Sequence, residues 1–361
     1  NGKSVYRAVS TISGGFGMIN ESDVAKYKFD INEVGLTELE AKDAGVTTAA
    51  GFGEYKTAIV VLGRVNSEGR DYLPGPDGVK NISAGEANEG AKDPLGLSNR
   101  ERDMIKMAKD NADKVVVIIN SNSPMEIPEV ANDEGVDAIL WIGTPGSYGM
   151  NGVVDVLTGK VNPSGKLPDT YAYDNSVSPA AQNWGIFSYD NLDEIATTEN
   201  DVAITAVKGP DGKPVGRSSS ADDLRASAYT VYQEGIYVGY KDYETSYFDS
   251  VMNSADTKAS SAKGAKDGAS SWVYKDEVLW PFGYGMSYTT FEQTLKSINV
   301  DKGAKTVTAV VNVKNTGTLD GKDAVQLYAS VPYTGYDKEN KIEKSAIQLL
   351  DYGKVDVPAG Q

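Results

Sequence analysis

Three short apolar segments stand out along the chain, because each runs for several residues with almost no polar interruption. They occupy residues 57–63 (TAIVVLG), 114–120 (KVVVIIN) and 137–143 (DAILWIG). Continuous runs of this length, rich in β-branched residues, are typical of strands buried on both faces, as in a parallel sheet. The pattern therefore predicts three buried parallel strands.

Segments with helical spacing alternate with these strands. After Ser98, whose hydroxyl can cap a first turn while Glu101 reaches back to it, apolar side chains recur at helical spacing until Lys114. Weaker helical patterns at residues 126–134 and 149–157 follow the second and third strands. A chain in which strands and helices alternate in this way is predicted to form an open, doubly wound α/β domain.

The second half of the chain has a different pattern. Residues 190–228 and 249–277 are polar and are predicted to be surface insertions, the first of them with a hairpin around its Gly-Pro-Asp-Gly turn. In the last part of the chain polar and apolar residues alternate between frequent turns, which is typical of an antiparallel β-sandwich. We therefore predict an α/β domain at residues 1–290 and a β-sandwich domain at residues 291–361.

The composition excludes several chemistries. The 361 residues include 35 Lys and Arg against 51 Asp and Glu, a net charge of −16, and neither histidine nor cysteine. Disulfides, thiol nucleophiles, imidazole-ligated metals and a Ser-His-Asp triad are thereby excluded, so acid–base chemistry falls to carboxylates, lysine or tyrosine. The negative charge argues against nucleic acid and anionic membranes as partners, and no segment is apolar for long enough to span a bilayer. We expect no cofactor and no metal.

The loop after the first strand holds the main candidates for chemistry, because ligands of open α/β sheets bind beyond the carboxyl ends of the strands. This loop contains Arg64, Glu68 and Asp71. Glu68 lies between a serine and a glycine, a backbone that lets a carboxylate approach a substrate closely. The alternative is a solvated loop acid near Arg64 and Arg70. Asp71 is expected to anchor the loop through backbone N–H groups or an arginine.

Other motifs suggest structural functions. Residues 120–124 (NSNSP) are expected to form a turn that caps the next helix. The glycine-rich segment 143–152 opens a helix but matches neither the dinucleotide fingerprint nor the P-loop, which disfavours a flavodoxin-like nucleotide binder. Trp184, Tyr232 and Trp280 could stack on sugar rings, although packing in a core or at an interface explains each of them as well.

Several segments, in order, resemble the non-barrel part of glycoside hydrolase family 3, the β-glucosidase family. Most specific are the run from residue 155 to 168 and the later WPFGYGMSYTTF. The matching segments are TAIVVLGRVNSEGRD (57–71), KVVVIINSNSPMEI (114–127), GVVDVLTGKVNPSGKLPDTY (152–171), YQEGIYVGYKDYET (232–245), WPFGYGMSYTTF (280–291) and VNVKNTGTLDGKDAVQLYAS (311–330).

The resemblance implies an (α/β)6-type sandwich followed by a fibronectin type III-like domain. In many members a loop of the form Gly-Arg-x-x-x-Glu-x-x-Asp carries the general acid/base, and here it begins at Gly63. The resemblance therefore makes Glu68 the expected catalytic acid/base and Arg64 and Asp71 expected substrate-binding residues. Members of the family normally add a (β/α)8 barrel with the nucleophilic aspartate. Neither the barrel nor a Ser-Asp-Trp-like nucleophile segment is found in this sequence, and residues 1–50 lack the expected opening strand.

We therefore expect a fragment of an exo-acting retaining β-glycosidase, cut inside both terminal regions, with its fibronectin III-like domain truncated. The expected substrate is a β-linked glycoside or oligosaccharide, most simply a β-glucoside, with β-xylosidase activity as an alternative within the class. The expected partner is the barrel domain of the same protein. The alternative from another class is a non-catalytic carbohydrate-binding or scaffolding module with the same fold. The compartment stays open, with a bacterial cytoplasm favoured over secretion.

Overall fold

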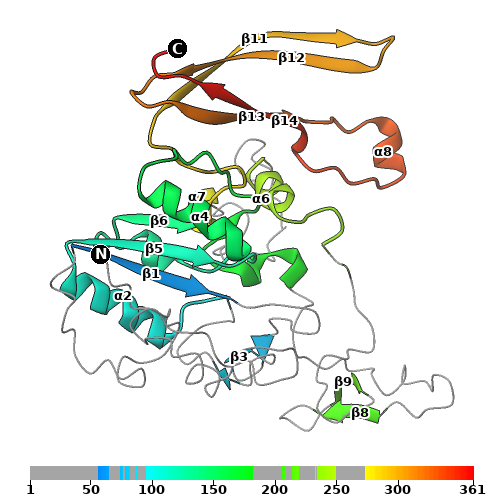
Figure 1. Cartoon of the computed structure of the whole chain (residues 1–361). Coiled ribbons are helices and arrows are strands. Elements are labelled where there is room, and N and C mark those ends of the chain that lie inside the picture. The colour runs from blue at the N-terminus through cyan, green and yellow to red at the C-terminus, as the bar shows by residue number, and fades with distance from the viewer. Residues whose placement is uncertain are drawn as a thin grey trace. The chain divides into compact units, whose positions relative to one another are not determined.

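The chain divides into two compact units, which are drawn together in Figure 1. Residues up to Thr144, with 205–208 and 214–218, belong to the first unit, and the later described residues belong to the second. The computed structural model describes residues 56–64, 74–75, 78–81, 86–87, 95–181, 205–208, 214–218, 232, 234–248 and 273–361.

A parallel three-stranded sheet forms the centre of the first unit (Figure 1). Its strands are β1 (Thr57–Gly63), β5 (Lys114–Asn120) and β6 (Ala138–Trp141), in the order β1–β5–β6. β1 and β5 pair along their whole length, with Thr57 opposite Lys114 and Gly63 opposite Asn120. The three predicted strands and their parallel arrangement are thus confirmed, although β6 is shorter than the predicted segment 137–143.

The burial of this sheet differs from strand to strand. In β5, Val117 and Ile119 on one face and Ile118 on the other are all buried, as expected of a central strand. In β1, Leu62 is fully buried but Ile59 is 51% exposed. The prediction of burial on both faces is therefore right for β5. It is wrong for β1 and for β6, where Ala138 is exposed and the other three residues are half-buried. In β1 the buried side chains of Val60 and Leu62 lie on one face of the strand, and Ile59 lies on the other face.

The helices of the first unit follow the predicted order. α2 (Asn99–Asn111) begins after Ser98 as predicted and packs against β1 and β5. α3 (Pro128–Ala131) starts with a proline at its first position, where no N–H donor is needed, but is much shorter than the predicted segment 126–134. It ends early because Asp133 accepts a hydrogen bond of 2.8 Å from the Gly135 N–H, which closes a turn in place of a further helical turn.

Short antiparallel strands complete the described part of the first unit. β8 and β9 pair with each other and flank the predicted Gly-Pro-Asp-Gly turn, which confirms the hairpin, while the turn itself lies outside the described residues. A second small sheet has the order β2–β3–β4. The bounds of these strands are β2 (Pro74–Gly75), β3 (Gly78–Asn81), β4 (Glu86–Ala87), β8 (Thr205–Lys208) and β9 (Pro214–Ser218).

The second unit begins with short elements around a small core. Its helix α4 starts three residues before the predicted segment 149–157, and β7 pairs with β10 in an antiparallel manner. The core consists of buried Ala172, Val177, Tyr243 and Val278, with Tyr274 packed against them. The elements are α4 (Gly146–Leu157), β7 (Tyr171–Ala172), the 3-10 turns η3 (Asn175–Val177) and η4 (Pro179–Ala181), α6 (Tyr240–Tyr247), α7 (Tyr274–Glu277) and β10 (Val278–Trp280).

The two motifs rich in glycine and proline, at residues 161–168 and 280–289, contact each other within the second unit. The Leu167 N–H donates to the Tyr284 carbonyl at 2.7 Å, and the Gly283 N–H donates to the Leu167 carbonyl at 2.8 Å. The two backbones therefore run close together. This explains why position 285 is a glycine, since an added Cβ would lie 2.2 Å from the backbone oxygen of Gly165.

Two antiparallel strand pairs form the rest of the second unit (Figure 1). β11 pairs with β12 and β13 pairs with β14, and β12 contacts both strands of the other pair. The antiparallel strands predicted from the alternating sequence are thus confirmed. The elements are β11 (Phe291–Asp301), β12 (Thr306–Asn315), β13 (Gly321–Ala329), α8 (Gly335–Glu339) and β14 (Gln348–Val357).

The molecule is therefore a mixed structure of helices and sheets. Within the described part of the chain, no helix combines the length and the apolar character that a membrane crossing requires.

Candidate functional site

The carboxyl edge of the parallel sheet is held together by hydrogen bonds between successive strand ends. The Arg64 N–H donates to the Asn120 carbonyl at 3.2 Å, and the Asn120 side-chain amide donates to the Gly143 carbonyl at 2.6 Å. The Trp141 indole N–H donates to the Ser121 carbonyl at 2.8 Å. The loops that leave this edge therefore start from fixed positions, including the loop that leads to Glu68.

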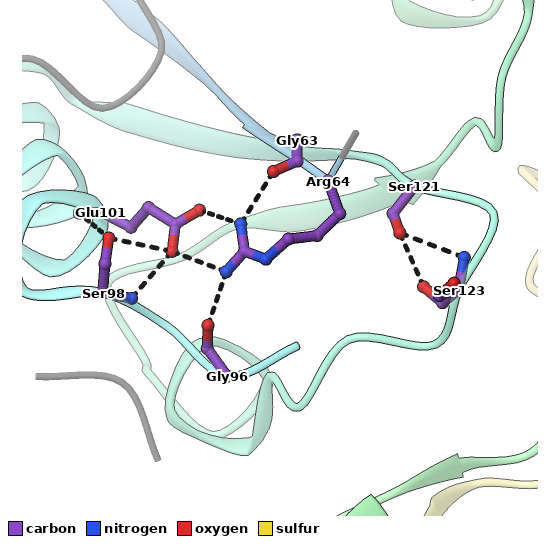
Figure 2. A network of polar contacts seen from close by, with 7 residues as sticks. All are labelled: Gly63, Arg64, Gly96, Ser98, Glu101, Ser121 and Ser123. Carbon is purple, nitrogen blue, oxygen red and sulfur yellow. Dashed lines mark hydrogen bonds and ion pairs between the residues drawn. The ribbon is translucent and has the colours of Figure 1, made fainter. Parts of the chain in front are cut away.

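Arg64 is the first residue after β1, and its buried guanidinium group points toward Glu101 and Gly96 (Figure 2). Nη1 and Nη2 contact the two carboxylate oxygens of Glu101 at 2.5 and 2.9 Å, which makes the ion pair bidentate. The same group donates to the Gly96 carbonyl at 2.5 Å and to the Gly63 carbonyl at 2.8 Å. The side chains of Arg64 and Glu101 are 3% and 0% exposed. A buried charge of this kind is tolerated because it is paired and hydrogen-bonded.

Glu101 also completes the N-terminal cap of α2. Its carboxylate accepts a hydrogen bond of 2.8 Å from the Ser98 backbone N–H, while its own N–H donates to the Ser98 hydroxyl at 3.3 Å. This reciprocal pattern is a capping box, and the helix dipole further favours a carboxylate in the first turn. One carboxylate therefore joins the end of β1 to the start of α2.

The segment before α2 supplies the third attachment of Arg64. Gly96 forms a parallel bridge with Glu126, and the Glu126 N–H donates to the Leu95 carbonyl at 2.9 Å. The neighbouring Leu97 is buried. These contacts fix the position of the Gly96 carbonyl independently of its hydrogen bond with Arg64.

The loop after β5 contains a second polar group at this edge (Figure 2). The buried Ser121 hydroxyl accepts from the Ser123 N–H at 3.1 Å and contacts the Ser123 carbonyl at 2.8 Å. The predicted turn is therefore present. The prediction that it caps the next helix is wrong, because α3 begins after Ile127 with no side-chain cap. The serine hydroxyl closes its own turn instead.

The structure describes only some of the predicted site residues. Glu68 and Asp71 lie outside the described residues, so their functions stay predictions, as does sugar binding by Arg64. Trp184 also lies outside the described residues. Tyr232 is exposed, and Trp280 lies between Tyr171 and Tyr284, whose ring centroids are each 5.9 Å from its own.

The sequence analysis did not predict that Glu101 pairs with Arg64. The sequence identified it as part of a capping box, and that prediction is confirmed. Its pairing with Arg64 joins positions 37 residues apart. The available signal was an arginine directly after a buried strand, because a guanidinium group in such a position needs a carboxylate partner. Among the described residues, no group of three or more acidic side chains is placed to hold a metal ion.

Comparison with solved structures relates this fold to β-glucosidases. β-Glucosidase 3B from Thermotoga neapolitana, solved in complex with glucose, superposes with a TM-score of 0.55 at 25% identity, over 95% of this chain and 38% of that one. A β-glucosidase from Paenibacillus barengoltzii superposes with a TM-score of 0.57 at 22% identity, over 94% of this chain and 28% of that one. Both alignments take in almost all of the present chain but less than half of the enzyme.

Sequence comparison gives the same relationship. Beta-glucosidase A of Butyrivibrio fibrisolvens is 29% identical, over 91% of this chain and 33% of the relative, and a β-glucosidase of Ruminococcus albus is 27% identical, over 89% and 24%. The chain thus spans about a quarter to a third of these relatives. A family model described as the glycosyl hydrolase family 3 C-terminal domain matches residues 18–240. Since this match takes in well over half of the sequence, the chain belongs to glycoside hydrolase family 3.

Proposed function

We propose that the chain is the non-barrel part of an exo-acting, retaining β-glycosidase, in the first instance a β-glucosidase, and that Glu68 is its general acid/base. The relatives that it resembles are named as β-glucosidases. The observation that carries the proposal for Glu68 is the motif Gly-Arg-x-x-x-Glu-x-x-Asp starting at Gly63, the last residue of β1. This motif leaves the sheet at its carboxyl edge, where ligands of α/β folds bind.

In the proposed mechanism, Glu68 acts twice. As an acid it protonates the glycosidic oxygen while a second carboxylate attacks the anomeric carbon, and as a base it then removes a proton from the water that releases the sugar. In retaining enzymes the two carboxyl groups lie about 5–5.5 Å apart. The second carboxylate is proposed to come from a (β/α)8 barrel of the same protein. Asp71 is proposed to bind the substrate. Arg64 is the weaker candidate for substrate binding, because its side chain is 3% exposed and is paired with Glu101.

The finer architecture is part of the proposal. We assign the parallel sheet and its helices to an (α/β)6-type sandwich domain at residues 1–290, with polar insertions at 190–228 and 249–277. The end of the second insertion returns to the core, where Tyr274 packs and Glu277 is buried. The two antiparallel pairs β11–β12 and β13–β14 support a fibronectin III-like domain at residues 291–361.

The proposal is tested with Glu68→Ala in the protein made from its complete open reading frame, with the exposed Glu134→Ala as a control. General acid–base catalysis contributes about 10²- to 10⁴-fold to the rate. Glu68→Ala should therefore lower kcat/KM for an alkyl β-glucoside by a factor in that range. A 2,4-dinitrophenyl β-glucoside needs no proton on its leaving group and should lose far less in kcat/KM. Azide attacks without a general base, so adding it should restore turnover and produce β-glucosyl azide.

Three results would contradict parts of the proposal. Equal losses of kcat/KM on both substrates, or no loss on the alkyl glucoside, would remove Glu68 from the acid/base position. Sugar binding by the complete protein without any turnover would favour the non-catalytic carbohydrate-binding module. Strong turnover of an aryl β-glucoside by residues 1–361 alone would show that the nucleophile does not come from a barrel outside this chain.

A further inference from the structure

We infer that Arg64 and Glu101 form a positioning pair, which sets the direction in which the loop carrying Glu68 leaves the sheet. The inference rests on the proposed function of Glu68, and it gives Arg64 a function through contacts inside the protein. Neither residue of the pair is proposed to donate or accept the catalytic proton.

The first step is the place of Arg64 in the chain. It lies four residues before Glu68, and a peptide segment of four residues reaches at most about 14 Å. Its backbone N–H is bonded to the Asn120 carbonyl at 3.2 Å, and its side chain is bonded to Glu101 and to the Gly96 carbonyl. Backbone and side chain together therefore fix both the position and the direction of the chain at the start of the loop.

The second step is that Glu101, which pairs with this arginine, is itself held in a fixed position. Its carboxylate is part of the capping box of α2, and it accepts hydrogen bonds from the Ser98 N–H at 2.8 Å and from Arg64 at 2.5 and 2.9 Å (Figure 2). Two hydrogen bonds between the planar guanidinium group and one carboxylate restrict the orientation of the arginine relative to that carboxylate. The first turn of α2 therefore determines how the Arg64 side chain is oriented.

The third step is energetic. Replacing a buried ion pair by apolar side chains of similar volume is often neutral or favourable for stability, so burial of this pair is weak support for a purely stabilising function. What an apolar pair cannot supply is the fixed, bidentate orientation and the hydrogen bond to the Gly96 carbonyl. The pair therefore contributes geometry to the loop that apolar packing would not replace.

The expected consequence is a selective loss of catalysis. A displacement of about 1 Å in a catalytic group can cost about 100-fold in rate, and here the displaced group is the proton donor. We expect Glu101→Gln to lower kcat/KM about 10- to 100-fold for an alkyl β-glucoside, within the range of general acid catalysis. For a 2,4-dinitrophenyl β-glucoside, whose departure needs no proton, the loss should be much smaller.

The test uses the protein made from its complete open reading frame and three changes. Glu101→Gln keeps the shape of the side chain and removes its charge. The double variant Arg64→Met/Glu101→Leu removes both charges and fills the space with apolar groups. The control is Glu129→Gln, which breaks the other bidentate pair of α2, with Arg102, where Glu129 is 55% exposed. Melting temperatures are measured for all of them.

The double variant separates positioning from stability. If the pair positions the loop, the double variant should still show the loss that depends on the leaving group. It should melt above Glu101→Gln, because no unpaired charge stays buried, and below the wild type, because the Ser98 N–H and the Gly96 carbonyl lose their partners. Recovery of kcat/KM together with the melting temperature would overturn the inference. So would a Glu101→Gln enzyme whose loss is the same for both substrates or no larger than that of Glu129→Gln.

Failure of the inference and failure of the proposed function give different results. If Glu68→Ala shows the leaving-group dependence and Glu101→Gln does not, only the inference is wrong. If Glu68→Ala shows none, the proposed acid/base itself is wrong. A raised KM for Arg64→Met that is equal for all leaving groups, with Glu101→Gln unchanged, would overturn the inference and support sugar binding by Arg64.

Discussion

Asp242 gives a prediction about stability that does not depend on the proposed catalysis. It lies in the first turn of α6, where the helix dipole favours a carboxylate by about 0.3–1 kcal/mol. Burial acts in the opposite direction and dominates, and the nearby Glu277 adds to it, so that the pKa of Asp242 is raised from 3.8 to about 7. Glu277 is itself buried. The change to make is Asp242→Asn, which is neutral at every pH.

The sign follows from the two pKa values. In the unfolded chain the carboxyl ionises near pH 4, whereas in the folded chain it keeps its proton up to about pH 7. The folded state therefore binds more protons between these values, and the stability of the wild type falls as the pH rises through this interval. Three pKa units correspond to about 4 kcal/mol, which is an upper figure for the loss. Above about pH 7 the loss is complete.

We expect Asp242→Asn to change the stability little at pH 4 and to raise it by up to about 4 kcal/mol at pH 8. The measurements are urea unfolding across this pH range and hydrogen exchange of the peptide that contains α6. The exposed Asp276→Asn is the matched control and should show no such pH dependence. A change in stability from Asp242→Asn that is the same at pH 4 and pH 8 would refute the argument, because it means that the folded carboxyl ionises near its ordinary pKa.

Two further predictions concern the second unit. Asn315→Ala removes a fully buried amide that donates to the Val357 carbonyl and accepts from the Thr289 hydroxyl. It should lower the free energy of unfolding in urea by at least about 2 kcal/mol, since each buried polar group left unpaired costs about 1–3 kcal/mol. Gly285→Ala places a Cβ 2.2 Å from the Gly165 carbonyl and should cost about 1–3 kcal/mol in the same measurement. The control Gly152→Ala meets no atom within 4 Å inside α4 and should be neutral or stabilising.

Those parts of the fold that depend on neighbours in the sequence could be predicted from it. The strands β1 and β5 follow from continuous apolar runs, and the start of α2 follows from the Ser98 and Glu101 capping box. The length of α3 could not be predicted, because the Asp133 turn competes with the helix through a single hydrogen bond. Nor could the exposure of Ile59, which depends on what packs against that face of β1.

In the candidate site, too, local features could be predicted from the sequence and distant contacts could not. The motif that begins at Gly63 placed Arg64 at the end of a strand, because the apolar pattern marks where β1 stops. Its partner Glu101 comes from another element, and helical periodicity carries no information about which strand end a capping residue meets. Distant pairs of this kind depend on the register of the sheet and the position of the helix together, so the sequence could not predict the partner of Arg64.

The ion pairs of α2 differ in how much stability is lost when one partner is removed. Three other pairs on this helix involve partly or largely exposed side chains, and such pairs contribute about 0–1 kcal/mol each. Removing one of them should therefore have little consequence for the stability of the fold. The buried pair cannot lose one partner without leaving a charge inside the protein, a loss of about 3–5 kcal/mol. A change at either position therefore needs a compensating change at the other, which keeps the exit of β1 and the first turn of α2 in one fixed relation.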